Sequence, residues 1–412
     1  MVSVATRLAD GRTQVFGSLL AMVFLVNMAR VIYAPLLEPF RTTFGASEAA
    51  VGLLATLVWI GSASLRLPTG YVLTKVPRHW VVLVAGGVLT VSSAFAATAQ
   101  TLSMLYIGAL TMGVASGVYF VSANPLVSEL FPARVGRVIG IHGTSSQVAA
   151  VSAPLLVVAY FAVPWPIAAW RAVFLTISVA ALLSTVTLFV TARRTTLPEA
   201  GGQDRRLWTA LRDQWPIIVT GVAIVSTVGL VWNGVFNFYV TFLVETRGFS
   251  QGRAQTYLTV LFAAGVPAFF ITGWIVDRVR ILPVVFSVIG SFAIGLVALT
   301  RIEGALGLLV MSVVLGYIIH SLFPAIDTYM LASLPDESRG SAYALFSGTM
   351  MPIQATGSVI LGTLVGRGIG FHRSFLLFAA AILVALAVMV VLDVAGKLPT
   401  AGPPGARHEP RE

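Results

Sequence analysis

Long runs of apolar residues, separated by short polar segments, dominate the chain. Each run is long enough to cross the apolar core of a bilayer as a helix, which takes about 20 residues. The runs lack the alternation of apolar and polar residues that marks the strands of a membrane barrel. We therefore predict an all-α membrane protein whose twelve transmembrane helices lie at residues 15–36, 49–73, 81–100, 104–128, 138–162, 169–191, 216–244, 254–276, 282–300, 305–332, 341–365 and 374–395.

The composition supports a membrane location. Apolar residues make up 57% of the chain and charged residues only 10%, and the mean hydropathy is +0.90. Polar surface of this extent is too small to cover a soluble protein of 412 residues. The run that follows Arg7 and Arg12 is too long for the core of a secretion signal, so we interpret it as the first span.

Basic residues predict the orientation. Most of the 26 lysines and arginines fall in the N-terminal segment, the C-terminal segment and every second loop between. Positive residues accumulate on the cytoplasmic side of membrane proteins, so we expect both termini there, in the cell membrane. The net charge of +10 then follows from topology, and we expect no nucleic-acid partner.

A polar segment at residues 193–215 divides the pattern into two halves, 1–192 and 216–395, with six runs each. Within this linker, Leu207, Trp208, Leu211 and Trp215 recur at helical spacing, which predicts a helix lying on the cytoplasmic membrane surface. Residues 396–412 are rich in proline and glycine, and we expect a disordered cytoplasmic tail.

The two halves repeat a short loop motif. Gly70, Lys75 and Arg78 follow the second run, and Gly273, Asp277 and Arg278 follow the eighth. Two copies at matching positions indicate a duplicated membrane unit.

This loop resembles the Gly-x-x-x-Asp-Arg-x-Gly-Arg-Arg motif of the major facilitator superfamily of secondary transporters. The resemblance covers all twelve runs. It implies two pseudo-symmetric six-helix halves that enclose a central substrate site and rock to expose it to each side of the membrane in turn. It further implies that the loop residues form a cytoplasmic gate.

The first copy of the motif departs from the family. Thr74 stands where the family has an acid that joins a charge network holding the halves together, and Pro77 stands for a glycine. Threonine can cap a helix but carries no charge. We hypothesise that Glu129, at the end of the fourth run, takes over this role in the gate.

Arg30 is the first candidate for substrate binding, because it lies near the middle of the first run. A charge there costs about 2.5–3.5 kcal/mol even on a lenient scale. Asn27, three residues earlier, shares its helix face. The pair could bind a carboxylate in a planar fork. The alternative is a structural ion pair between Arg30 and an acid on another helix. Arg66, one turn before the Gly70 loop, fits the gate better than the substrate.

Asn233 and Asn237 share one face of the seventh run. They could line the opposite wall of the cavity, or they could equally join two helices by amide hydrogen bonds. The glycines Gly113 and Gly117 in the fourth run have the spacing of close helix packing.

Asp327 and His320 lie about two turns apart on one face of the tenth run, so they are candidates for a proton-coupling site. A gate role for Asp327, paired with Arg278 or Arg339, is slightly favoured.

Together these features predict a secondary transporter of a small solute, with an organic anion held by Arg30, Asn27, Asn233 and Asn237, and with protons as the candidate coupling ion. The alternatives are an efflux pump for amphipathic or cationic compounds and a non-transporting membrane sensor on the same fold. We expect a monomer without cofactor or metal, since the chain lacks cysteine and its five histidines are scattered. No phosphate-cradling loop or catalytic elbow is present, so we expect no enzyme.

Overall fold

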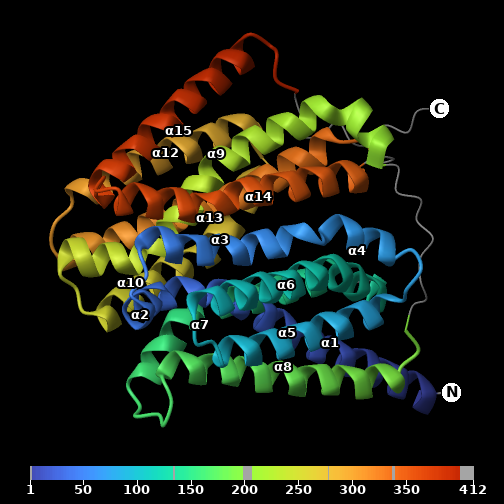
Figure 1. The fold of residues 1–412 in the computed structure, drawn as a ribbon. Coiled ribbons are helices and arrows are strands. Elements are labelled where there is room, and N and C mark those ends of the chain that lie inside the picture. The colour runs from blue at the N-terminus through green and yellow to red at the C-terminus, as the bar shows by residue number, and fades with distance from the viewer. Residues whose placement is uncertain (1, 133–134, 198–206, 277, 336–338, 400–412) are drawn as a thin grey trace. The chain divides into compact units, whose positions relative to one another are not determined.

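A computed structural model of the chain describes residues 2–132, 135–197, 207–276, 278–335 and 339–399. Each long regular element in these residues is an α-helix (Figure 1). The helices are α1 (Val2–Val31), α2 (Tyr33–Phe44), α3 (Glu48–Ser64), α4 (Arg66–Val72), α5 (Arg78–Ala97), α6 (Leu102–Leu130), α7 (Val135–Phe161), α8 (Ala169–Arg193), α9 (Leu207–Arg247), α10 (Gln251–Ala263), α11 (Gly265–Val276), α12 (Ile281–Arg301), α13 (Ala305–Ser333), α14 (Arg339–Gly366) and α15 (Phe371–Val394).

Twelve helical stretches in the described residues are long and apolar enough to cross a membrane. Their positions follow the predicted runs closely: the sixth, for example, is predicted at 169–191 and observed at Ala169–Arg193. The prediction of an all-α protein with twelve transmembrane helices is confirmed.

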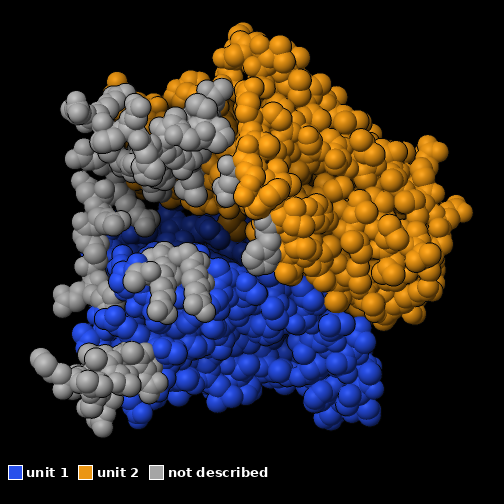
Figure 2. All heavy atoms as spheres, turned by 180° about the vertical axis from the view of Figure 1, so that it is seen from behind, with its two compact units in different colours: residues 1–204 blue, residues 205–412 orange. Residues whose placement is uncertain are grey.

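Contacts divide the chain into two compact units, Met1–Asp204 and Arg205–Glu412, which Figure 2 distinguishes by colour. The same pairs of helices pack in each unit. In the first, α1 packs on α7, α3 on α6, and α5 on both α6 and α8. In the second, α9 packs on α14, α10 on α13, and α12 on both α13 and α15. The two units therefore share one arrangement, as a duplicated unit should.

Glycines allow the closest of these helix crossings. A Cβ atom added to Gly113 of α6 would overlap the carbonyl oxygen of Val58 in α3, and one added to Gly117 would overlap that of Ser62. The second unit has the corresponding contact, where Gly316 of α13 lies against the backbone of Leu261 in α10. The close packing predicted from the Gly113 and Gly117 spacing is present.

Spans two and eight are each broken into two helices. Span two changes from α3 to α4 at Leu65, and span eight changes from α10 to α11 at Ala264. The breaks occur in corresponding spans of the two units, so they are part of the repeated design. Span one has its own break at Ile32, between α1 and α2, and its helix continues to Phe44, beyond the predicted end at residue 36.

The amphipathic segment 207–215 differs from the expectation. It begins α9, which runs without interruption through Pro216 to Arg247. Pro216 lies inside this helix, where it can donate no backbone hydrogen bond, and the helix nevertheless continues past it. Trp208 and Trp215 are exposed on this first part of the helix. The segment is therefore an extension of span seven and no separate element.

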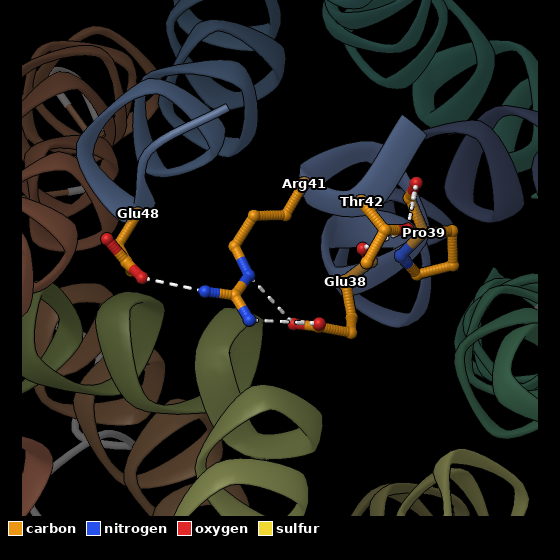
Figure 3. Close-up of polar contacts among 5 residues, drawn as sticks. All are labelled: Glu38, Pro39, Arg41, Thr42 and Glu48. Carbon is orange, nitrogen blue, oxygen red and sulfur yellow. Dashed lines mark hydrogen bonds and ion pairs between the residues drawn. The ribbon is translucent and has the colours of Figure 1, made fainter. Parts of the chain in front are cut away.

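Ion pairs fix the turn between spans one and two. Arg41 near the end of α2 contacts Glu38 at 3.1 Å and Glu48 at the start of α3 at 2.8 Å (Figure 3). Gly45 between them adopts a left-handed conformation, with φ of 59°, that glycine accepts without strain. The adjoining ends of the two spans are thereby held together.

We predict that Gly113→Ala lowers the melting temperature of the detergent-purified protein, because the added methyl group forces α3 and α6 apart. Overpacking of this kind costs about 1–3 kcal/mol. Gly87→Ala in α5 is the matched control, since nothing lies within 4 Å of a Cβ atom at Gly87. Equal melting temperatures for the two variants would contradict the tight crossing.

Candidate functional site

Arg30 lies at the end of α1, half-buried in the first unit. Its Nη2 donates to Oδ1 of Asn27 at 2.5 Å. The Asn27 Nδ2 in turn donates to the backbone oxygen of Ser146 in α7 at 2.6 Å. With both ends of its amide engaged, Asn27 positions the Arg30 guanidinium and joins α1 to α7.

Two aromatic rings flank this guanidinium. The Arg30 Cζ lies 4.5 Å from the ring centre of Trp59 in α3 and 5.1 Å from that of Phe120 in α6. Both distances permit cation–π attraction, which partly replaces lost hydration. The charge is thus stabilised by neutral groups.

The guanidinium keeps unused hydrogen-bonding capacity. Its Nε is buried and has no hydrogen-bond partner within the described part of the chain. No carboxylate among the described residues of the first unit lies within ion-pair distance of Arg30, so a structural ion pair within that unit finds no support. Arginine presents five N–H donors in a planar fork, and an incoming carboxylate could accept two of them.

A second positive charge lies close to Arg30. Arg66 at the start of α4 is near enough for its charge to act on the Arg30 guanidinium. Its Nε donates to the backbone oxygen of Ser62 at 3.1 Å. The sequence favours a gate position for Arg66, which stays a prediction; its charge also acts on that of Arg30. Two positive charges at one place favour an anion.

Asn233 and Asn237 are buried in α9 and bind Ser358 of α14. The Asn237 Nδ2 donates to the Ser358 Oγ at 3.0 Å, and this hydroxyl donates to Asn233 Oδ1 at 2.7 Å. The helices approach closely because Gly234 and Gly357 face each other's backbones. This geometry matches the helix-joining alternative for the two asparagines.

His320 is enclosed by aromatic rings in the second unit. Its Nδ1 donates to the backbone oxygen of Gly316 at 2.7 Å, which requires the proton on Nδ1. The side chain is 5% exposed. The surrounding rings, with centroids at 5.7–6.3 Å, are Trp232, Phe262, Phe269 and Phe323.

Asp327 binds a tyrosine. Its Oδ1 accepts a hydrogen bond of 2.8 Å from the Tyr343 hydroxyl of α14. Arg278, the expected gate partner, donates instead to the backbone oxygen of Trp274 at 2.8 Å and lies 4.0 Å above that ring. The side chain of Arg339 lies outside the described residues. Asp327 and His320 thus have different partners, although they share a helix.

Two of the residues that the sequence predicts for a gate, Arg78 and Glu129, form an ion pair in the first unit. Arg78 begins α5, and its Nη2 lies 3.0 Å from Oε1 of Glu129 near the end of α6. Thr74 donates from Oγ1 to the backbone oxygen of Tyr71 at 2.7 Å, which caps the end of α4. Lys75 lies 4.9 Å from the Tyr71 ring. Gly70 is buried in α4.

In the second unit, Gly273 lies in α11 with open space around it. Asp277 lies outside the described residues.

Sequence reasoning missed the aromatic and hydroxyl partners. Trp59, Phe120, Ser358 and Tyr343 carry no signal in the sequence, because their importance depends on which helices pack together.

A family model for the Major Facilitator Superfamily matches residues 19–353. The putative niacin/nicotinamide transporter NiaP of Bacillus subtilis (strain 168) is 25% identical over 359 residues, which cover 81% of this chain and 85% of that protein. The niacin transporter NiaP of Acinetobacter baylyi is 25% identical over 171 residues, which cover 40% of this chain and 38% of that protein.

Solved structures show the same fold. A bacterial homologue of the human lysosomal transporter Spinster, inward-facing and occupied, superposes with a TM-score of 0.78 at 17% identity, over 93% of this chain and 97% of that chain. The D-xylose-proton symporter gives 0.76 at 16% identity, over 95% and 98%. These likenesses concern the fold alone.

We predict that Ser358→Ala destabilises the protein, since both asparagines lose a buried partner at once. An unsatisfied buried polar group costs about 1–3 kcal/mol. Thr356→Ala on the same helix is the control, because its hydroxyl donates within α14, to Ile353. Thermal unfolding in detergent measures both, and a melting temperature for Ser358→Ala no lower than that of the control would remove the structural role.

Proposed function

Because the chain belongs to the major facilitator superfamily of transporters, we propose that it is a secondary active transporter of a small organic anion, bound through Arg30. The observation that carries this proposal is the Arg30 site of the first unit. A desolvated guanidinium with a free N–H, neutral neighbours and a second arginine nearby is suited to a carboxylate. The carboxylate would supply the counter-charge.

The aromatic walls favour a planar anion. Trp59 and Phe120 come from different helices and leave the guanidinium between their rings. A ring attached to the carboxylate would find apolar surface beside the charge. Niacin, the substrate in the names of two relatives, is a pyridine carboxylic acid, which combines both features. We therefore favour aromatic monocarboxylates as the substrate class.

We further propose how the chain works in the membrane. It is an integral membrane protein of the cell membrane with both termini in the cytoplasm, acts as a monomer, and exposes its site by alternating access of the two halves. Asn233 and Asn237 support the site indirectly in this proposal: bound to Ser358, they hold α9 against α14 and do not contact the substrate. The Arg78 and Glu129 pair, with Gly70, Lys75, Gly273, Asp277 and Arg278, forms the cytoplasmic gate.

Proton coupling is proposed at Asp327, with His320 on the same helix as its relay. Asp327 is half-buried with a hydroxyl partner and no described cation, so protonation would cost no ion pair there. A carboxyl group in such surroundings binds a proton more readily than one paired with an arginine.

We predict that proteoliposomes containing the protein take up radiolabelled niacin and benzoate but far less nicotinamide, which keeps the ring of niacin and lacks its charge. Arg30→Ala should abolish uptake of the acids. Charged hydrogen bonds are worth about 1.5–3 kcal/mol each, so losing two costs roughly 100-fold or more. Arg30→Lys should restore little of the uptake, because lysine lacks the planar fork.

Arg194→Ala is the matched control, since this exposed arginine lies at the end of α8. Uptake of the acids at wild-type rates by both Arg30 variants would contradict the proposed site.

We predict that Asp327→Asn removes the stimulation of uptake by an inward-directed proton gradient, while exchange of labelled for unlabelled substrate continues. Asparagine keeps the hydrogen bond to Tyr343 but cannot bind a proton. Uptake measured at several external pH values distinguishes the two processes. An unchanged pH dependence would move Asp327 from coupling to the gate.

A further inference from the structure

The second unit contains a cavity that the transport site does not use. It has a volume of about 500 Å³ and lies between α11, α12 and α13. Apolar side chains such as Val284, Val288 and Ile318 line most of it, and Arg280 lines it at the residue just before α12 begins.

Small residues open this cavity along α12. Pro283, Ser287 and Ser291 succeed one another every fourth position, and all three are exposed. They therefore lie on one face of the helix. Lipid-facing helix surfaces usually carry larger apolar side chains. The small residues on this face therefore leave space that such side chains would fill.

The cavity is lined by polar groups that differ in their exposure. Arg280 is exposed, and α12 begins beside it without an acidic residue in its first turn. Thr272 of α11 also lines the cavity, is only 3% exposed, and forms no hydrogen bond within the described chain. A threonine buried in a membrane helix ordinarily donates its hydroxyl to the backbone of the preceding turn. Because Thr272 does not do so among the described residues, its hydroxyl is available to an occupant of the cavity.

Neighbouring residues mark the depth. The exposed Trp274, with Arg278 lying 4.0 Å above its ring, has the character of a membrane-interface anchor. Arg280 is at the same end of the unit, whereas Ser291 lies 11 positions further along α12, or about 16 Å deeper. That depth is about half the apolar core of a bilayer, the reach of one leaflet.

We propose that this cavity binds one anionic phospholipid of the leaflet at the Arg280 end, which is the inner leaflet in the proposed orientation. Arg280 and the N-terminus of α12 bind the phosphate. Thr272 donates to an ester oxygen of the glycerol backbone. An acyl chain follows Val284, Val288 and Ser291 into the membrane. A free anion would use only the first of these contacts, whereas a phospholipid uses all three.

The test is lipid retention by the full-length protein. Protein purified in mild detergent is incubated with equal amounts of phosphatidylglycerol and phosphatidylcholine, and the bound lipid is counted by native mass spectrometry. We expect one phosphatidylglycerol to be retained in preference to phosphatidylcholine. Arg280→Gln should reduce that retention about tenfold, the cost of one charged hydrogen bond.

Two further variants separate the contacts. Thr272→Val, which preserves shape, should weaken retention of phosphatidylglycerol, and Arg301→Gln, at the opposite end of the same helix, should leave it unchanged. Melting temperatures of the variants check that each is folded. Equal retention of the two lipids, or equal losses for Arg280→Gln and Arg301→Gln, would overturn the site. Displacement of the lipid by millimolar inorganic phosphate would overturn the lipid assignment in favour of a free anion.

Discussion

A half-buried guanidinium in a membrane-spanning helix is the constraint on which the first unit depends. Arg30 loses part of its hydration there, so groups on neighbouring helices must replace it. Asn27 holds one edge of it, and the rings of Trp59 and Phe120 cover it from α3 and α6. These groups reach it only because α3 and α6 cross at glycines and Asn27 ties α1 to α7. The close helix packing and the position of the Arg30 guanidinium therefore depend on each other.

The two units repeat the same helix pairs but use their polar residues differently. In the first, the Arg30 Nε has no partner in the described chain. In the second, Asn233 and Asn237 bind Ser358 across the α9 and α14 crossing. The duplicated fold places helices at matching positions in the two units. The side chains at these positions differ, so Arg30 keeps a free N–H whereas the two asparagines join helices. In the proposed function the anion binds in the first unit, so contacts that the substrate gains there would bias the balance between states.

The sequence predicts much of this fold because lipid leaves few choices: apolar runs of about 20 residues must be helices. It also identifies Arg30 as a candidate binding residue, since a charged residue within an apolar run is easily recognised. The partners of Arg30 and Asp327 could not be predicted, because periodicity gives the face of a helix but not the neighbour that the face meets. Trp59, Phe120 and Tyr343 all come from other helices. The continuity of α9 through Pro216 was missed for a local reason, as a proline after an amphipathic segment imitates a helix start.

The substitution of Thr74 for the acid of the family motif gains a physical meaning from these contacts. Thr74 donates its hydroxyl to the backbone oxygen of Tyr71, so it stabilises only the end of α4. Glu129, which we hypothesise to take over the role of that acid, pairs with Arg78 and joins α5 to α6. This pair is made within one unit, and its Nε and Oε2 atoms have no partners in the described chain. A single monodentate contact between half-buried groups is worth less than a network. In the proposed gate, we therefore expect this pair to resist opening less than the charge network of the family motif would.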